Sequence, residues 1–110
     1  MDFLSLKSNV EKNNLHYFYS LTDIERSCLI SKKFYISPSS SQDTLLHVAC
    51  RHGRQQILTY LVQEVGLQIE ISNKDFKRAT HEAAQFSELA CLKTLLQNGA
   101  QVDPLKRADW

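Results

Sequence analysis

Histidine and cysteine are the residues of this sequence with the widest chemical range, and it contains four histidines and three cysteines. The run His81-Glu82-Ala83-Ala84-Gln85 begins like the His-Glu-x-x-His zinc motif, but Gln85 stands in place of the second histidine ligand. One histidine and one glutamate do not make a zinc site, which needs three or four protein ligands. We therefore expect neither a metal ion nor a cofactor.

The sequence carries no motif of a common catalytic or nucleotide-binding site. The patterns GxGxxG, GxxxxGK and GxSxG are missing, and three glycines in the whole chain leave little for a phosphate-binding loop. Nothing groups a nucleophile with a base, although catalytic residues can lie far apart in a sequence. We expect the protein not to be an enzyme.

The cysteines, Cys28, Cys50 and Cys91, are odd in number and form no CxxC pair. Cys50 and Cys91 fall at apolar positions of predicted helices, so we expect them to be small buried residues; a reactive or metal-binding thiol is the alternative. Free thiols suit a reducing compartment, which favours the cytoplasm or the nucleus. No apolar run approaches the length of a membrane span, and residues 1–7 do not have the pattern of a secretory signal.

The elements that position these side chains repeat along the chain. The interval from His47 to His81 equals the interval from Ala49 to Ala83. Gly66 recurs as Gly99 one position early, a slip that we assign to the turn because loops tolerate insertions. The same period links two sets of apolar residues: Ile57, Leu58, Leu61 and Val62, and then Cys91, Leu92, Leu95 and Leu96. A fixed period of this length, roughly 34 residues, is typical of repeat proteins.

Each repeat predicts a pair of helices. Residues 57, 58, 61, 62 and 65 form an apolar stripe on one helical face. The preceding helix is about two turns long and carries Ala49 or Ala83 where another helix must come close. Gly53 lies between the two helices, where a left-handed turn suits glycine. Such a hairpin exposes an apolar face unless a neighbouring repeat covers it, so the repeats are expected to stack.

This pattern resembles the ankyrin repeat, which has a period of about 33 residues and the motif T-P-L-H-x-A. The first repeat has Thr44-Leu45-Leu46-His47-Val48-Ala49, with Leu45 in place of proline. The second has Arg78-Ala79-Thr80-His81-Glu82-Ala83, a weaker match, and Ser87 where the turn glycine is expected. The resemblance implies an all-α solenoid of stacked helix-turn-helix repeats with projecting loops. It also implies that the two histidines tie neighbouring loops together. The residues assigned to the repeat motif are Thr44, Leu46, His47, Ala49, Gly53, His81, Ala83 and Gly99.

We divide the chain into a divergent capping segment over 1–41, ankyrin repeats over 42–74 and 75–108, and the start of a truncated further repeat at 109–110. Within the cap, Thr22 and Glu25 have the spacing of a capping box, which predicts a helix start. Ser37-Pro38-Ser39-Ser40-Ser41 predicts a loop. The alternative is that residues 1–41 form a partly disordered leader. A cap with two repeats is near the minimum for a stable stack, so we expect marginal stability.

In a stack of this kind the long loops and the exposed side of the short helices form one face. On this face aromatic and basic side chains alternate, the mixture enriched at protein-binding hot spots. The alternative for any single residue is an ordinary solvated loop. The basic residues could also contact an RNA backbone, but the net charge of +1 does not favour it. The candidate partner-binding residues are Arg51, His52, Asn73, Lys74, Phe76, Lys77, Gln85, Phe86, Lys106, Arg107 and Trp110.

Residues 43–47, 51–53, 73–78 and 102–110 are similar to one member of the ankyrin family in particular. That resemblance implies a protein-binding adaptor that works beside alanyl-tRNA synthetase and limits the mischarging of serine onto its tRNA. The alternatives are a structural capping fragment of a longer array and an accessory protein that contacts RNA. We expect a monomer that does not enter a membrane.

Overall fold

The structure, a computed structural model, describes residues 2–100, and the expected all-α class is confirmed over this range. Its β-structure is limited to one isolated antiparallel bridge between Ile36 and Thr44. Within the described residues the helices are α1 (Phe3–Glu11), α2 (Leu15–Tyr19), α3 (Asp23–Cys28), α4 (Lys32–Tyr35), α5 (Leu45–Arg51), α6 (Gln55–Thr59), the π-helical turn η1 (Tyr60–Val65), α7 (Ala79–Gln85) and α8 (Leu89–Gln97).

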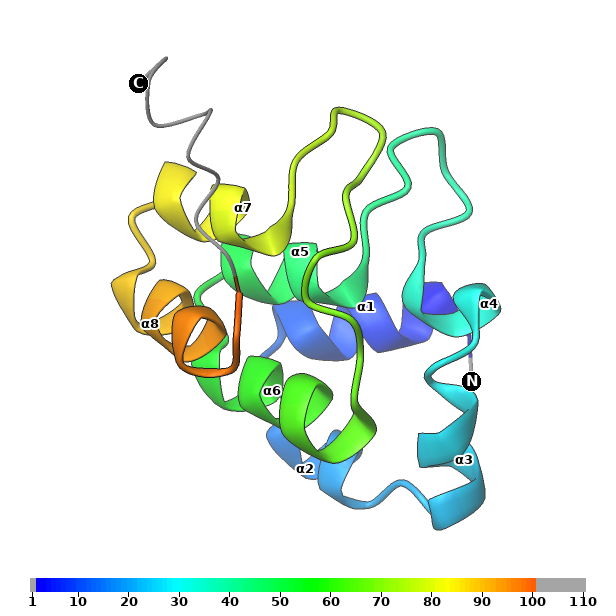
Figure 1. Cartoon of the computed structure of the whole chain (residues 1–110). Helices are drawn as coiled ribbons and strands as arrows, with labels where there is room; N and C mark the ends of the chain where they lie inside the picture. Colours follow the sequence, from blue (N-terminus) through cyan, green and yellow to red (C-terminus); the bar gives the residue numbers. More distant parts are fainter. Residues whose placement is uncertain (1, 101–110) are drawn as a thin grey trace.

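The helices stack in two rows, as Figure 1 shows. Helices α1, α5 and α7 lie side by side in one row, and α2, α6 and α8 form the other. The short helix α5 is buried along almost its whole length, because it lies in the middle of its row with a neighbour on each side. Ile57, Leu58 and Leu61 of the predicted stripe are buried, and the stripe therefore faces the core as expected.

The N-terminal segment packs on the first repeat. Phe3, Leu6 and Val10 of α1 are buried, and α1 and α2 contact α5 and α6 respectively. The Arg54 guanidinium donates to the carbonyl oxygens of Val10 at 3.3 Å and Glu11 at 2.6 Å, so it satisfies the carboxyl end of α1. This placement is what the capping interpretation requires, whereas the proposed domain limits stay a prediction.

The predicted capping box at the start of α3 is confirmed. The backbone amide of Thr22 donates to the Glu25 carboxylate at 3.0 Å, and the amide of Glu25 donates to the Thr22 hydroxyl at 3.2 Å. This reciprocal bonding satisfies two backbone donors at the helix start. The helix lies beyond α2, at the base of the molecule in Figure 1.

We expected the one-position slip of the repeat to lie in the turn, and this prediction was wrong. Leu61 and Gly66 are one position further apart than Leu95 and Gly99, their counterparts in the second repeat. The structure accommodates the extra residue inside the second helix, where the Gly66 amide donates to the Leu61 carbonyl at 3.1 Å to close a π-helical turn. A π-bulge is the way a helix absorbs a single inserted residue without breaking its register on either side.

Candidate interaction surface

Two loops, residues 36–44 and 71–78, project beyond the amino ends of α5 and α7 and lie next to each other (Figure 1). Each loop is closed by its own backbone: the Ser37 amide donates to the Asp43 carbonyl at 2.7 Å, and the Asn73 amide donates to the Lys77 carbonyl at 2.9 Å. The Lys74 amide donates across the gap to the Ser41 carbonyl at 2.8 Å. The two loops are therefore fixed relative to each other.

Asn73 holds the second loop together from inside. Its side-chain amide donates to the Asp43 carboxylate at 2.9 Å, and its side-chain oxygen accepts from the amides of Asp75 at 2.9 Å and Lys77 at 3.0 Å. We predicted that Asn73 contacts a partner, but it is only 8% exposed. The correction follows from its short side chain, which bonds to nearby backbone more readily than it extends into solvent.

Phe76 occupies the tip of the second loop in an unusual conformation. Its φ is +62°, in the left-handed region that favours glycine, and its side chain is 84% exposed. Gln42, at the equivalent position one repeat earlier, has the same conformation, with a φ of +54°. Because both repeats share this conformation, the left-handed φ belongs to the turn of the loop. The exposed ring of Phe76 gains nothing from folding and is available for contacts outside the fold.

His47 connects the start of α5 to the second loop. Its Nδ1 accepts from the Thr44 amide at 3.1 Å, and its Nε2 lies 2.7 Å from the Lys77 carbonyl oxygen. Because a backbone amide only donates and a carbonyl only accepts, the proton is assigned to Nε2 and the imidazole is neutral. Burial holds the pKa of His47 below its ordinary value.

The corresponding contact of His81 is made at the start of α7. The Nδ1 of His81 accepts from the Arg78 amide at 2.9 Å, in the same way that Nδ1 of His47 accepts from Thr44. The repeated histidine thus occupies the first turn of both short helices, where backbone amides need an acceptor.

Arg51, another predicted partner-binding residue, is engaged within the fold. Its guanidinium forms ion pairs with Asp43 at 3.0 Å and with Glu82 at 3.1 Å. Burial alone would raise the pKa of Asp43, but hydrogen bonds from Asn73 and Arg51 outweigh it and leave this pKa below its usual value. Arg51 belongs to α5, and Glu82 is nearly buried on α7. Their ion pair therefore joins the two short helices. The structure therefore assigns Arg51 to the fold.

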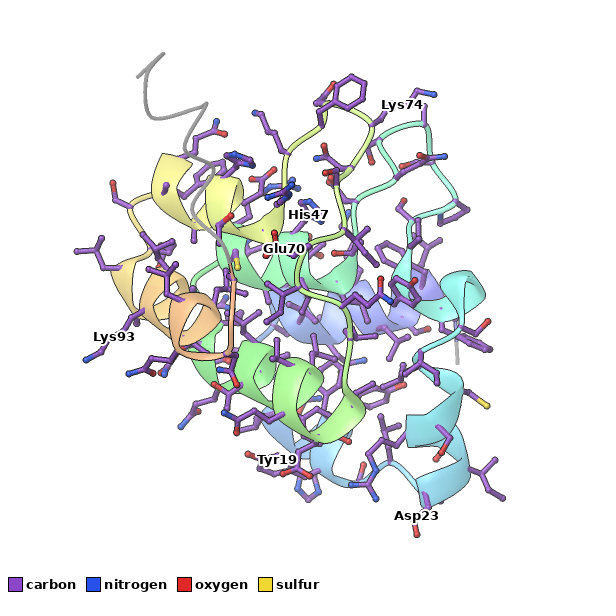
Figure 2. The ribbon with its side chains drawn as sticks, viewed as in Figure 1. Tyr19, Asp23, His47, Glu70, Lys74 and Lys93 are labelled. Carbon is purple, nitrogen blue, oxygen red and sulfur yellow. The ribbon has the colours of Figure 1, made fainter. Side chains whose placement is uncertain are left out.

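Lys77, at the end of the second loop, reaches Gln85 on the exposed side of α7. The Lys77 ammonium donates to the Gln85 side-chain oxygen at 3.1 Å, so the lysine stem lies along the helix. Lys74 and Phe76 lie on the loop beside them, and Figure 2 shows Lys74 at the outer end of the molecule. We call Lys74, Phe76, Lys77 and Gln85 the loop-tip surface.

The remaining candidates lie elsewhere. His52 and Phe86 follow the carboxyl ends of α5 and α7, the ends opposite the loops. The His52 ring lies 3.6 Å from the Glu11 carboxylate of α1, whereas Phe86 is 44% exposed. Lys106, Arg107 and Trp110 lie outside the described residues, as does the predicted start of a further repeat at 109–110.

Sequence reasoning missed Asp43, Gln42 and Glu82. Glu82 had a detectable signal, because it takes the repeat position that Val48 occupies in the first repeat, and a charge at a core position demands a partner. The position of Gln42 also follows from the period once Phe76 is singled out. The ion pair of Asp43 with Arg51 and its hydrogen bond from Asn73 had no sequence signal, since they depend on how the loop folds back onto α5.

Cys50 and Cys91 are buried, as predicted. A hydrogen bond between the two thiols, together with burial, raises the pKa of Cys50. Among residues 2–100 no three metal-binding side chains gather, and no helix of that range has the length and apolar character to cross a membrane.

Comparisons with known proteins agree with the repeat pattern. A family model described as ankyrin repeats, in three copies, matches residues 6–106. Mouse (Mus musculus) synphilin-1 is 33% identical over 70 residues, which cover 61% of this chain and 7% of synphilin-1. Cortactin-binding protein 2 of Rhinolophus ferrumequinum is 36% identical over 67 residues, 61% of this chain and 4% of that protein. The chain thus spans less than a tenth of the length of either relative.

Proposed function

Since this chain belongs to the ankyrin-repeat family, we propose that it is a non-enzymatic module that binds a protein partner through the loop-tip surface. Phe76 is the observation that carries the proposal. A loop that is fixed by hydrogen bonds within itself and to the rest of the fold holds an exposed aromatic ring in a strained conformation. A rigid anchor of this kind loses little entropy on binding, because its loop is already ordered.

The neighbouring side chains suit a protein surface. Aromatic residues dominate the energy of protein interfaces when they enter a pocket of the partner, and flanking polar groups set the orientation. The Lys74 ammonium and the Lys77–Gln85 pair flank Phe76 in this manner. The relatives support binding as the class of function, and one of them carries binding in its name.

Photo-crosslinking tests the proposal directly. A photoreactive phenylalanine analogue at position 76 should produce discrete protein adducts in cells, and the same analogue at Leu4 should not. Leu4 is the matched control, since it is an apolar residue that is 64% exposed and belongs to α1 rather than to either loop. Equal adducts at both positions, or none at position 76, would contradict the proposal that Phe76 contacts a protein partner.

Charge reversal separates a binding role from a purely structural one. Lys74→Glu with Lys77→Glu should lower partner capture, whereas Lys93→Glu on α8 should not, and all variants should unfold at similar temperatures. Figure 2 shows Lys93 far from Lys74. If the double variant captures every partner as before, the chain is better described as a structural capping unit.

An RNA partner predicts a different result. Contacts to phosphates release counterions, so binding would weaken steeply as salt rises, and nuclease would remove the adducts. The near-neutral chain favours a protein, for which the salt dependence should be shallow.

A narrower candidate is alanyl-tRNA synthetase. The runs 43–47 and 73–78 are similar to ankyrin repeat domain-containing protein sixteen, whose association with that enzyme limits serine mischarging. Purified alanyl-tRNA synthetase should bind the chain, an unrelated synthetase should not, and Phe76→Gly should abolish the difference. Absence of binding by the folded chain would rule out this partner and leave the loop-tip proposal to the crosslinking test.

We further propose that the chain acts as a monomer in the cytoplasm or nucleus. The free cysteines of the described region support a reducing compartment. Fractionation of cells and sedimentation of the purified chain test the two statements.

A further inference from the structure

A polar depression lies at the base of the molecule, away from the loop-tip surface. Its volume is about 490 Å³, which falls within the range of small-ligand sites. Its walls come from three parts of the fold: α2, α3 and the second helix of the first repeat. The side chains that matter for the argument are Tyr19, Arg26, Gln56, Tyr60, Gln63 and Glu64.

The inserted residue of the repeat helps to shape this depression. Tyr60, Gln63 and Glu64 all belong to η1, the π-helical turn that contains the extra residue. Such turns occur often at functional sites, because they widen the helix and redirect its side chains. Another wall includes Arg26 of α3, a short helix that follows α2 in the chain and belongs to neither row of the stack. The walls from η1 and α3 are therefore departures from the regular stack.

Two tyrosines supply the aromatic part of the site. The rings of Tyr19 and Tyr60 meet edge to face, with centroids 5.5 Å apart. Tyr60 is 5% exposed and is fixed by the core, whereas Tyr19 is 61% exposed and offers its ring to solvent. Figure 2 shows Tyr19 at the end of the molecule opposite Lys74. An open aromatic face held by a buried ring attracts cations.

The charged side chains that line the depression are Arg26 and Glu64. Arg26 lines the depression, but it is paired with Asp23 on its own helix. Among the side chains that the structure describes, those of residues 2–31 and 34–100, no cation lies within ion-pair distance of Glu64. The charges of Glu64 and Arg26 both act on the Tyr60 hydroxyl. Asp23, Arg26 and Glu64 together carry one net negative charge. The site therefore favours a cationic ligand.

The amide side chains add acceptors around this carboxylate. Gln63 donates its N–H to Asn98 at 3.2 Å, which leaves its oxygen free to accept. The exposed Gln56 offers a second oxygen. A flat group with several N–H donors could bond to Glu64 and to these oxygens while it stacks on Tyr19.

We propose that this depression binds an arginine side chain of a partner protein. A guanidinium is planar, donates in several directions and stacks on aromatic rings. It is also more weakly hydrated than an ammonium, so it tolerates the nearby Arg26 guanidinium better than lysine does. The site is separate from the loop-tip surface and lets the module contact its surroundings from both ends.

NMR titration of the full chain with N-acetyl-arginine-N′-methylamide tests the proposal. We expect saturable shifts of the backbone amides of Tyr19, Gln56, Gln63 and Glu64. Glu64→Gln should weaken binding about fivefold and Tyr19→Ala about threefold, because they remove an exposed charged bond and a stacking surface. The matched controls Asp75→Asn and Phe76→Gly, both at the loop tip, should bind as the unaltered chain does.

Three results would overturn it. These are the absence of saturable shifts at these amides, equal binding by Glu64→Gln, and equal or tighter binding of the corresponding blocked citrulline or blocked lysine. Dispersed amide spectra of each variant show that the fold is retained, so loss of binding by Glu64→Gln reports on the carboxylate itself. Because the Phe76 variant is a control here, failure of this site leaves the proposed function intact.

Discussion

Gly53 and Ser87 occupy the same turn of successive repeats, and both have left-handed backbones, with φ of +70° and +57°. Glycine adopts this conformation without strain, whereas serine does so against its Cβ. The second hairpin therefore keeps the turn geometry of the first, but Ser87 holds it with backbone strain that Gly53 avoids.

Ser87→Gly should stabilise the chain by about 0.5–1 kcal/mol, because the relief of strain exceeds the entropy that glycine adds to the unfolded state. Urea denaturation measures the change. The reciprocal Gly53→Ser should destabilise, since a Cβ at this position meets the Glu88 carboxylate as well as the backbone strain. A stability loss for Ser87→Gly would contradict the strained turn.

Phe76→Gly should also raise the free energy of unfolding, by about 0.5–1 kcal/mol, since it relieves strain and removes an exposed ring. Phe76→Ala should leave stability nearly unchanged, as alanine retains a Cβ in the left-handed region. Thermal unfolding of both variants, read beside partner capture, distinguishes a binding residue from a fold residue. If Phe76→Gly destabilises the chain, the ring packs against the fold and the binding proposal loses its support.

The chain should become less stable as the solution is acidified below pH 6.5. The pKa of His47 in the folded chain lies below its ordinary 6.5, mainly because it is buried, so the unfolded chain takes up a proton first. Its contribution is complete above that pH and is lost on the way down to the folded pKa, with a slope of at most about 1.4 kcal/mol per pH unit. Denaturation between pH 5 and 8 measures this slope.

Substitution of single histidines tests whether His47 causes the pH dependence of stability. His47→Gln should flatten the slope between pH 5 and 6.5, whereas His16→Gln, at an exposed position of α2, should keep it. A slope that survives His47→Gln would assign the effect to another group.

Arg51→Ala should destabilise the chain by about 2 kcal/mol, since it leaves the nearly buried Glu82 and the half-buried Asp43 without their shared cation. The matched control is Arg26→Ala, which breaks an exposed pair with Asp23 and should cost roughly 0.5 kcal/mol or less. Equal losses for the two variants would show that the Arg51 pairs contribute no more than surface pairs do.

The sequence by itself determined the helical class, the repeat period and the burial of residues such as Ile57, Leu61 and Cys91. These features are local or periodic, because the side of a helix that faces the core follows from the spacing of its apolar residues. The same periodicity pairs His47 with His81 and Gly53 with Ser87.

Only the tertiary structure decided which polar residues are free to bind. Asn73 and Arg51 are residue types common at interfaces, yet both side chains donate hydrogen bonds to Asp43. Asp43 is distant from Asn73 in the sequence and lies in the loop before the helix of Arg51. The extra residue before Gly66 likewise fits a loop or a helix equally well in the sequence, and the folded chain keeps it inside a helix. Hydrogen bonds between distant residues depend on how repeats stack, and no local spacing encodes that geometry.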